Sequence, residues 1–106
     1  MITLEIQNLE IDLIIDFLSN QCSDILSKVW REGDIVAGVF ILEDSEKQNL
    51  GINITTIVDY GASTEICKVT VHAARTAGVE NDATAAEERL RKKLIDFAEE
   101  NEWTWR

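Results

Sequence analysis

The sequence contains no proline and half as many basic as acidic residues, ten Lys and Arg against twenty Asp and Glu. The formal charge is therefore −10. Proteins that bind nucleic acid draw much of their affinity from basic side chains that neutralise phosphates, and anionic lipid surfaces also attract basic segments. The densest basic segment, residues 89–93, is flanked by acidic residues on both sides. The charge argues against nucleic acid and membranes as partners and favours basic protein surfaces.

Residues suited to binding a metal or cofactor are also scarce. His72 is the only histidine, and Cys22 and Cys67 lie far apart without a CxxC spacing. The chain has no glycine-rich phosphate loop and no EF-hand spacing. We therefore predict no metal and no cofactor, and two reduced, buried thiols. The sequence leaves a disulfide between the two cysteines open.

The sequence also lacks a long hydrophobic run. The longest apolar stretch, residues 35–42, is far shorter than a membrane span. Residues 1–7 lack the positive charge of a signal peptide, so the expected location is the cytoplasm. A chain of 106 residues that is 45% hydrophobic suits one domain over residues 1–106.

Hydrophobic spacing in the first third of the chain predicts a strand followed by a helix. Residues 2–7 alternate between apolar and polar, as in a strand. Apolar residues from Ile11 to Val29 then recur at spacings of three and four, which predicts one long helix ending near Gly33. A competing interpretation continues the strand through Phe17 and begins the helix near Ser19. The absence of turn residues after the first strand favours the longer helix.

Residues 35–43, 50–60 and 64–74 are predicted to be three consecutive strands. A polar loop separates the first two, and Gly61 marks the turn between the last two. Pairing Tyr60 with Ser63 places Ile54 opposite Val69, so that the apolar faces of the two strands coincide.

The last part of the chain predicts a second helix and a short tail. Thr84 to Glu87 matches a capping box, with Asp82 as an alternative cap, and an apolar stripe continues to about Glu100. The expected fold is α+β: a two-layer sandwich of order β-α-β-β-β-α, with two helices on one face of a mostly antiparallel four-stranded sheet. Residues 103–105 would extend it as a short strand.

Two classes of function follow. In the first, the protein is a non-catalytic interaction domain that self-associates through its sheet, with a homodimer expected and a protein partner as the target. The helices can cover only one face of the sheet, so apolar side chains on the other face would form the contact. The residues expected there are Val36, Phe40, Leu42, Ile57 and Ile66, with Ile57 and Ile66 paired on the outer side of the hairpin.

The alternative is a small enzyme or ligand-binding protein with a polar pocket. Its residues would be Gly51, Asp59, Tyr60 and His72, where His72 acts as a general base and Gly51 leaves room for a ligand. A half-exposed strand histidine with one local hydrogen bond explains His72 more simply. No catalytic residue is therefore assigned.

The two tryptophans of the tail also admit two interpretations. Trp103 and Trp105 would share one side of the short strand. They form either a partner-docking tip or a segment that folds back to close the core, and the second interpretation is favoured.

Overall fold

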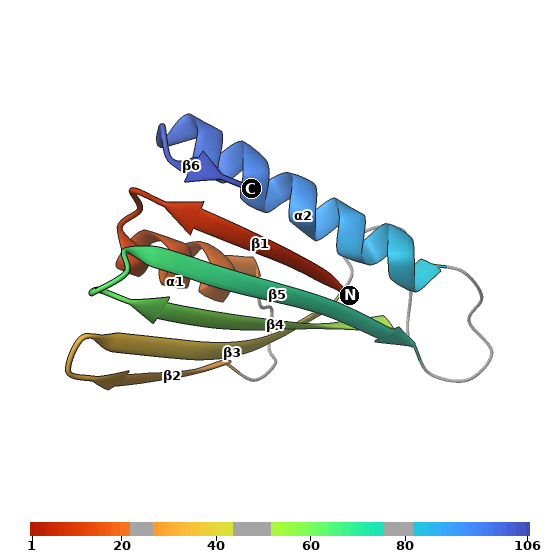
Figure 1. Cartoon of the computed structure of the whole chain (residues 1–106). Coiled ribbons are helices and arrows are strands. Elements are labelled where there is room, and N and C mark those ends of the chain that lie inside the picture. Colours follow the sequence, from red (N-terminus) through yellow and green to blue (C-terminus); the bar gives the residue numbers. More distant parts are fainter. Residues whose placement is uncertain (22–26, 44–51, 76–81) are drawn as a thin grey trace.

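The computed structural model describes residues 1–21, 27–43, 52–75 and 82–106, which form two helices packed on an antiparallel six-stranded sheet (Figure 1). The strand order across the sheet is β2-β3-β4-β5-β1-β6. The elements are β1 (Ile2–Gln7), α1 (Ile11–Gln21), β2 (Ser27–Glu32), β3 (Ile35–Glu43), β4 (Ile52–Gly61), β5 (Ile66–Arg75), α2 (Asp82–Glu100) and β6 (Thr104–Trp105). The α+β class is confirmed, whereas the predicted four-stranded sheet and β-α-β-β-β-α order are wrong.

One of the additional strands is β2, at one edge of the sheet, which the sequence analysis had assigned to the first helix. In the structure α1 ends at Gln21, and residues 27–32 pair with β3 in a hairpin. Gly33, with a φ of +58°, and Asp34 form the two-residue turn. Glycine adopts this left-handed conformation without steric cost, so Gly33 serves as a hairpin residue rather than a helix terminator.

The β4–β5 hairpin keeps its predicted faces but not its predicted register. Tyr60 lies opposite Cys67 rather than Ser63, because residues 62–65 form a longer connection. The N–H groups of Thr64 and Glu65 both donate to the carbonyl of Gly61, which closes this connection. The shift is four residues, and an even shift returns every side chain to the same face.

Both helices cover the same face of the sheet, and this covered face contains the core. Phe17 of α1 stacks on Phe97 of α2, with 4.4 Å between ring centroids. The buried residues of the helices are Ile14, Ile15, Leu18, Ala86, Leu90, Leu94, Ile95 and Ala98. Those of the strands include Leu4, Ile6, Val36, Phe40, Ile54, Val58, Cys67, Val69, Val71 and Ala73. Within the described residues, no helix or second sheet covers the opposite face of the sheet.

Phe40 is the largest fully buried side chain, and its ring packs over Gly38 on the same strand. A Cβ atom at Gly38 would lie only 2.8 Å from Cε1 of Phe40. Opposite Phe40 lies Thr56, whose buried hydroxyl has no hydrogen-bond partner in the described structure. The position of the Phe40 ring therefore requires a residue without a side chain at Gly38.

The chain after α2 folds back onto the sheet. Trp103 N–H donates to the Ala98 carbonyl, with Glu102 in the left-handed conformation, as at a Schellman helix end. The expected short strand is confirmed as β6, which pairs with β1. Arg106 and Glu5 exchange two backbone hydrogen bonds of 2.8 and 2.9 Å beyond it.

Candidate functional site

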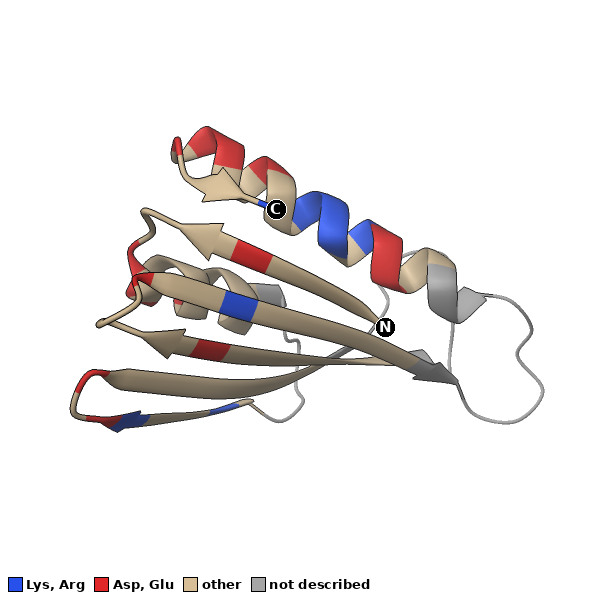
Figure 2. Ribbon diagram, in the orientation of Figure 1, with Lys and Arg blue, Asp and Glu red and all other residues tan. Residues whose placement is uncertain are grey.

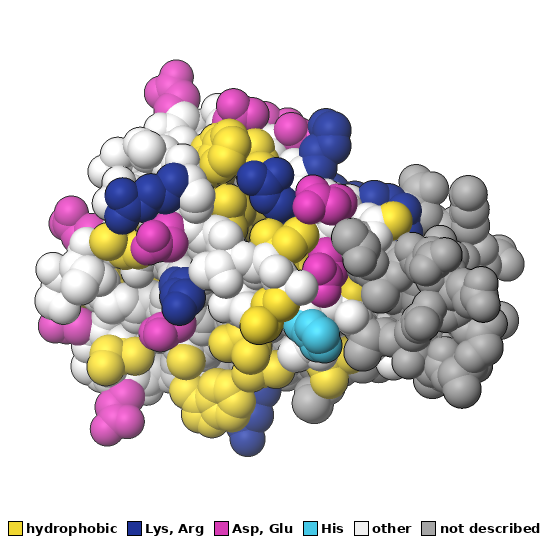
Figure 3. All heavy atoms as spheres, turned by 45° about the vertical axis from the view of Figure 1, so that its right-hand side comes forward, with side chains coloured by type: hydrophobic (Ala, Val, Ile, Leu, Met, Phe, Trp, Pro, Cys, Tyr) yellow, Lys and Arg dark blue, Asp and Glu magenta, His cyan; other side chains and the backbone are white. Residues whose placement is uncertain are grey.

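The face of the sheet opposite the helices, called here the open face, is apolar over β2, β3 and β4. Three large side chains are exposed there: Trp30 by 48%, Ile35 by 57% and Ile57 by 46%. Ala37, Val39 and Ile41 continue the same face of β3 from Ile35 and are half-buried. These six residues are called the apolar patch. Figure 3 shows hydrophobic side chains gathered in the lower part of the view, next to a broader polar surface.

The rest of the open face is polar and electrically almost balanced. Glu5, Lys68 and Asp59 follow one another across β1, β5 and β4, so a positive charge lies between two negative ones (Figure 2). Lys28 and Glu32 flank Trp30 on β2, and the Lys28 ammonium lies 5.3 Å from the Trp30 ring. These five described side chains carry two positive and three negative charges, although the whole chain carries −10.

The structure places the predicted interface residues on two different faces. Val36 and Phe40 belong to the covered face and are 7% and 0% exposed, so their expected place on the open face is wrong. The side chain of Leu42 lies outside the described structure. Ile57 and Ile66 are on the open face, but Ile57 lies opposite Thr70 and Ile66 opposite Gly61, so they do not pair. Of the expected contact residues, Ile57 alone belongs to the apolar patch.

The predicted polar pocket does not assemble around His72. Asp59 and Tyr60 line an open depression of about 400 Å³ at the end of the β4–β5 hairpin, together with Lys68. His72 lies opposite Thr55 on the sheet, four residues along the strand from the Asp59–Lys68 pair, which is about 13 Å. Gly51 is outside the described residues. The alternative site thus lacks the grouping of residues that its chemistry requires.

His72 instead lies near a buried carboxylate that the sequence analysis had assigned to a helix cap. Its Nδ1 is 3.8 Å from Glu87 Oε2. Glu87 accepts a 2.8 Å hydrogen bond from Ala73 N–H, and its other oxygen lies 3.0 Å from the amino group of Met1. The Ala73 donor lies just beyond the last described pair of β1 and β5, so Glu87 supplies the acceptor that a longer strand would have supplied.

The pKa of the Glu87 carboxyl reflects opposing effects. Burial favours the neutral form and would raise the pKa. The hydrogen bond from Ala73, the amino group of Met1 and His72 favour the carboxylate, and together they lower the pKa below its usual value of 4.5. A group whose pKa is lower in the folded state stabilises the fold above its unfolded pKa, and this contribution is lost as the pH falls through the folded pKa.

Glu87→Gln is therefore expected to lower the free energy of unfolding at pH 7 by about 1–3 kcal/mol, because a buried charged acceptor is lost. Below pH 4.5 the wild type loses the contribution of this carboxylate, so the difference between the two proteins should shrink. Urea denaturation at several pH values measures both effects. Glu88→Gln, an exposed neighbour with the same change of charge, and His72→Ala should each stay within about 0.5 kcal/mol of wild type. A Glu87→Gln difference that is constant down to pH 3 contradicts this account.

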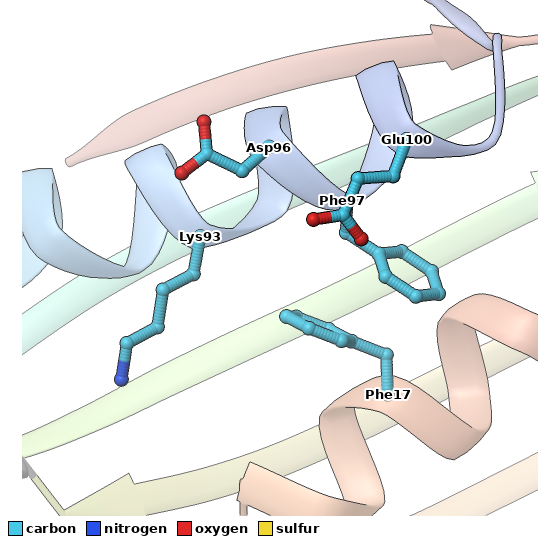
Figure 4. Close-up of a pocket in the computed structure, with 5 residues that line it drawn as sticks. All are labelled: Phe17, Lys93, Asp96, Phe97 and Glu100. Carbon is cyan, nitrogen blue, oxygen red and sulfur yellow. The ribbon is translucent and has the colours of Figure 1, made fainter.

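A second hollow lies between the helices on the other side of the molecule. Phe17 and Phe97 point toward one another across it, with Lys93, Asp96 and Glu100 around them (Figure 4). Its volume is about 370 Å³. The stacked rings close its base, so the hollow is a shallow groove over the core.

The tail tryptophans are part of the fold. Trp103 is 8% exposed and meets Phe97 edge to face at 5.4 Å between centroids. Trp105 is half-buried, and the Arg91 guanidinium lies 5.9 Å from its ring. Trp103 therefore closes the core, as the favoured interpretation of the tail expected.

The described residues include no cluster of three or more side chains that could hold a metal ion. Cys67 is a free, buried thiol, whereas Cys22 lies outside the described structure. None of the helices in the described part of the chain has the length and apolar character needed to cross a bilayer.

Sequence reasoning missed Trp30 because it missed β2, and it missed the patch residues of β3 because it chose the other face of that strand. The signal was present: Lys28, Trp30 and Glu32 alternate with Val29 and Arg31 immediately before a Gly-Asp turn, which is typical of a hairpin. That alternation places Trp30 on the open face beside Ala37 and Val39.

No family model matches the chain, and no curated protein or solved structure shows significant similarity to it.

Proposed function

We propose that this protein is a non-catalytic interaction domain that self-associates through the open face of its sheet. The observation that carries the proposal is the apolar patch, in which Trp30, Ile35 and Ile57 are each about half exposed and lie on neighbouring strands. Contiguous exposed apolar surface of this kind usually marks a binding site. Burying one such side chain contributes about 1.5–3 kcal/mol.

The distribution of charge favours a second copy of the chain as the occupant. A net charge of −10 makes most surfaces of two copies repel each other. On the open face Lys28 and Lys68 nearly offset the carboxylates of Glu5, Glu32 and Asp59, so this face is where two copies can approach with least repulsion. A two-fold symmetric contact is the commonest arrangement for such a pair.

Ile57→Lys is expected to raise the dissociation constant for self-association about tenfold or more, because it places a charge within the patch, next to Val39. The subunit should stay folded, since Ile57 is 46% exposed and points away from the core. Light scattering over a concentration series measures the association, and thermal unfolding measures the fold.

Leu13→Lys provides the matched control for this variant. Leu13 is another exposed aliphatic residue, at 37%, but it lies on α1 on the opposite side of the molecule. It should leave association unchanged. A wild type that remains monomeric at high concentration, or an equal effect of the two substitutions, contradicts the proposed function.

A further inference from the structure

The edge strand β2 forms one border of the sheet (Figure 1), and among the described residues no other strand pairs with its outer side. It lies at the end of the strand order, and only Val29 among its six residues is even half-buried. An exposed strand edge of this kind is a template for pairing with another strand. Which strand fits depends on the groups that face outward and on the side chains beside them.

The direction of the backbone groups follows from the neighbouring ladder. Ala62 N–H donates to the carbonyl of Asp34, so the polar groups of Asp34 face β4. The direction of the backbone N–H and C=O groups alternates from one residue to the next along an antiparallel strand, so the groups of Ala37 face β2. Trp30, which lies opposite Ala37, is thus bonded toward β3. The N–H and C=O groups of Val29 and Arg31 consequently point to the free edge.

This direction restricts the ways in which two copies of β2 can pair. In an antiparallel two-fold contact, Val29 and Arg31 must bond to outward-pointing groups of the other copy. Centring the axis on Arg31 puts two arginines opposite each other, and centring it on Lys28 does the same for two lysines. Centring it on Val29 places each Lys28 opposite Trp30 and pairs no charges. Centring it on Trp30 places each Lys28 opposite Glu32 of the other copy. This last register alone sets opposite charges against each other at both ends of the strand.

We propose that two copies of this chain join edge to edge through β2, with the two-fold axis at Trp30. Val29 and Arg31 of each copy exchange backbone hydrogen bonds with Arg31 and Val29 of the other. Lys28 and Glu32 form an ion pair at each end. The two Trp30 side chains meet in a non-hydrogen-bonded position, where the strands bring side chains closest. The partner at this edge is thus a second copy of the chain. When two copies of β2 run antiparallel about Trp30, the positive Lys28 of each lies opposite the negative Glu32 of the other.

The edge contact is independent of the face contact proposed above, but the two are compatible. The apolar patch is off-centre and includes Trp30 on β2 itself. Joining two sheets at this edge places two patches side by side on one continuous face. Stacking of two such pairs through that face would give a four-chain assembly with two kinds of contact.

Charge reversal on the edge tests the proposal. Lys28→Glu places two like-charged pairs across the axis, and Glu32→Lys does the same with the opposite sign. Each variant alone should weaken the edge contact by about tenfold or more. In an equimolar mixture the charges become complementary again, so native mass spectrometry should show the mixed dimer in large excess over either homodimer. Lys92→Glu on α2, with the same change of charge, is the control and should have no effect.

Amide exchange gives a second readout that does not depend on a substitution. In the edge-paired protein the N–H groups of Val29 and Arg31 should be protected, and protection should disappear on dilution. The N–H of Trp30 should be protected at every concentration. A self-associated protein in which Val29 and Arg31 exchange at solvent rates, or charge variants that do not recombine, overturns the edge contact.

The edge contact and the face contact predict different experimental results. If only the edge contact exists, Ile57→Lys leaves the dimer and the protection of Val29 unchanged. If only the face contact exists, Ile57→Lys abolishes association, and the N–H groups of Val29 and Arg31 exchange at solvent rates even in the associated wild type. If both exist, only the double variant is monomeric. A monomeric wild type overturns both.

Discussion

Phe40→Ala is expected to lower the free energy of unfolding by about 3–5 kcal/mol, a large part of the total stability of a domain of this size. The ring is fully buried between β3 and α1, and the cavity left by its removal would be lined by Gly38, Thr56 and Ile15. Gly38 has no side chain to fill the space. Urea denaturation at matched protein concentration measures the loss, and a cost below about 1 kcal/mol would contradict this packing.

The same contact predicts a coupling between Gly38 and Phe40. Gly38→Ala should cost about 1–3 kcal/mol in the wild type, because its Cβ would lie 2.8 Å from a buried ring atom that has no room to move. In a Phe40→Leu background no atom occupies the Cε1 position, so the cost should fall below about 0.5 kcal/mol. Additive costs in the double-mutant cycle would show that the two residues do not constrain each other.

The thiol of Cys67 is expected to react with iodoacetamide on the order of a thousandfold more slowly in the native protein than in urea at pH 8. Burial, together with the smaller effect of the nearby Asp59 carboxylate, raises the pKa of this thiol to about 12. The reactive thiolate is then a very small fraction of the thiol, and the reagent cannot reach the covered face of the sheet.

Labelling resolved by peptide mass spectrometry measures Cys67 separately from Cys22. Iodoacetamide in urea provides the reference rate for each thiol. Native labelling of Cys67 at the unfolded rate would contradict its place in the core. Slow labelling that accelerates with increasing urea, in step with global unfolding, would confirm it.

The parts of the fold that could be predicted from sequence are those in which a single period is unambiguous. Residues 2–7 alternate strictly, and α2 has one apolar stripe from Ala86 to Ala98. The β4–β5 faces were also correct, although Tyr60 pairs four residues away from its predicted partner. Side chains of a strand return to the same face of the sheet every two residues. A register error of an even number of residues therefore leaves each side chain on its correct face.

The open face could not be predicted because β3 is apolar on both sides. Val36 and Phe40 alternate with Ala37, Val39 and Ile41, so composition does not indicate which set faces the helices. Which face of β3 packs against the helices depends on the β2–β3 turn at Gly33 and on Gly38. Gly38 has no side chain, which leaves room for the Phe40 ring beneath α1. Residues 25–29 fit helical spacing as well as a strand, and this coincidence hid β2. The separation of His72 from Asp59 could not be predicted for a related reason, since it follows from the observed strand register.

The place of β1 between β5 and β6 has a kinetic consequence. β2 to β5 are neighbours in sequence as well as in the sheet, so their hairpins close comparatively short loops. β1 comes from the first residues of the chain, but both strands beside it come from the second half. Its pairing closes the longest loops in the sheet and is expected to be the slow step of assembly. Until β1 docks, β5 presents a bare edge that the β1 of another molecule fits equally well. Strand exchange during refolding at high concentration is the misassembly that this topology favours.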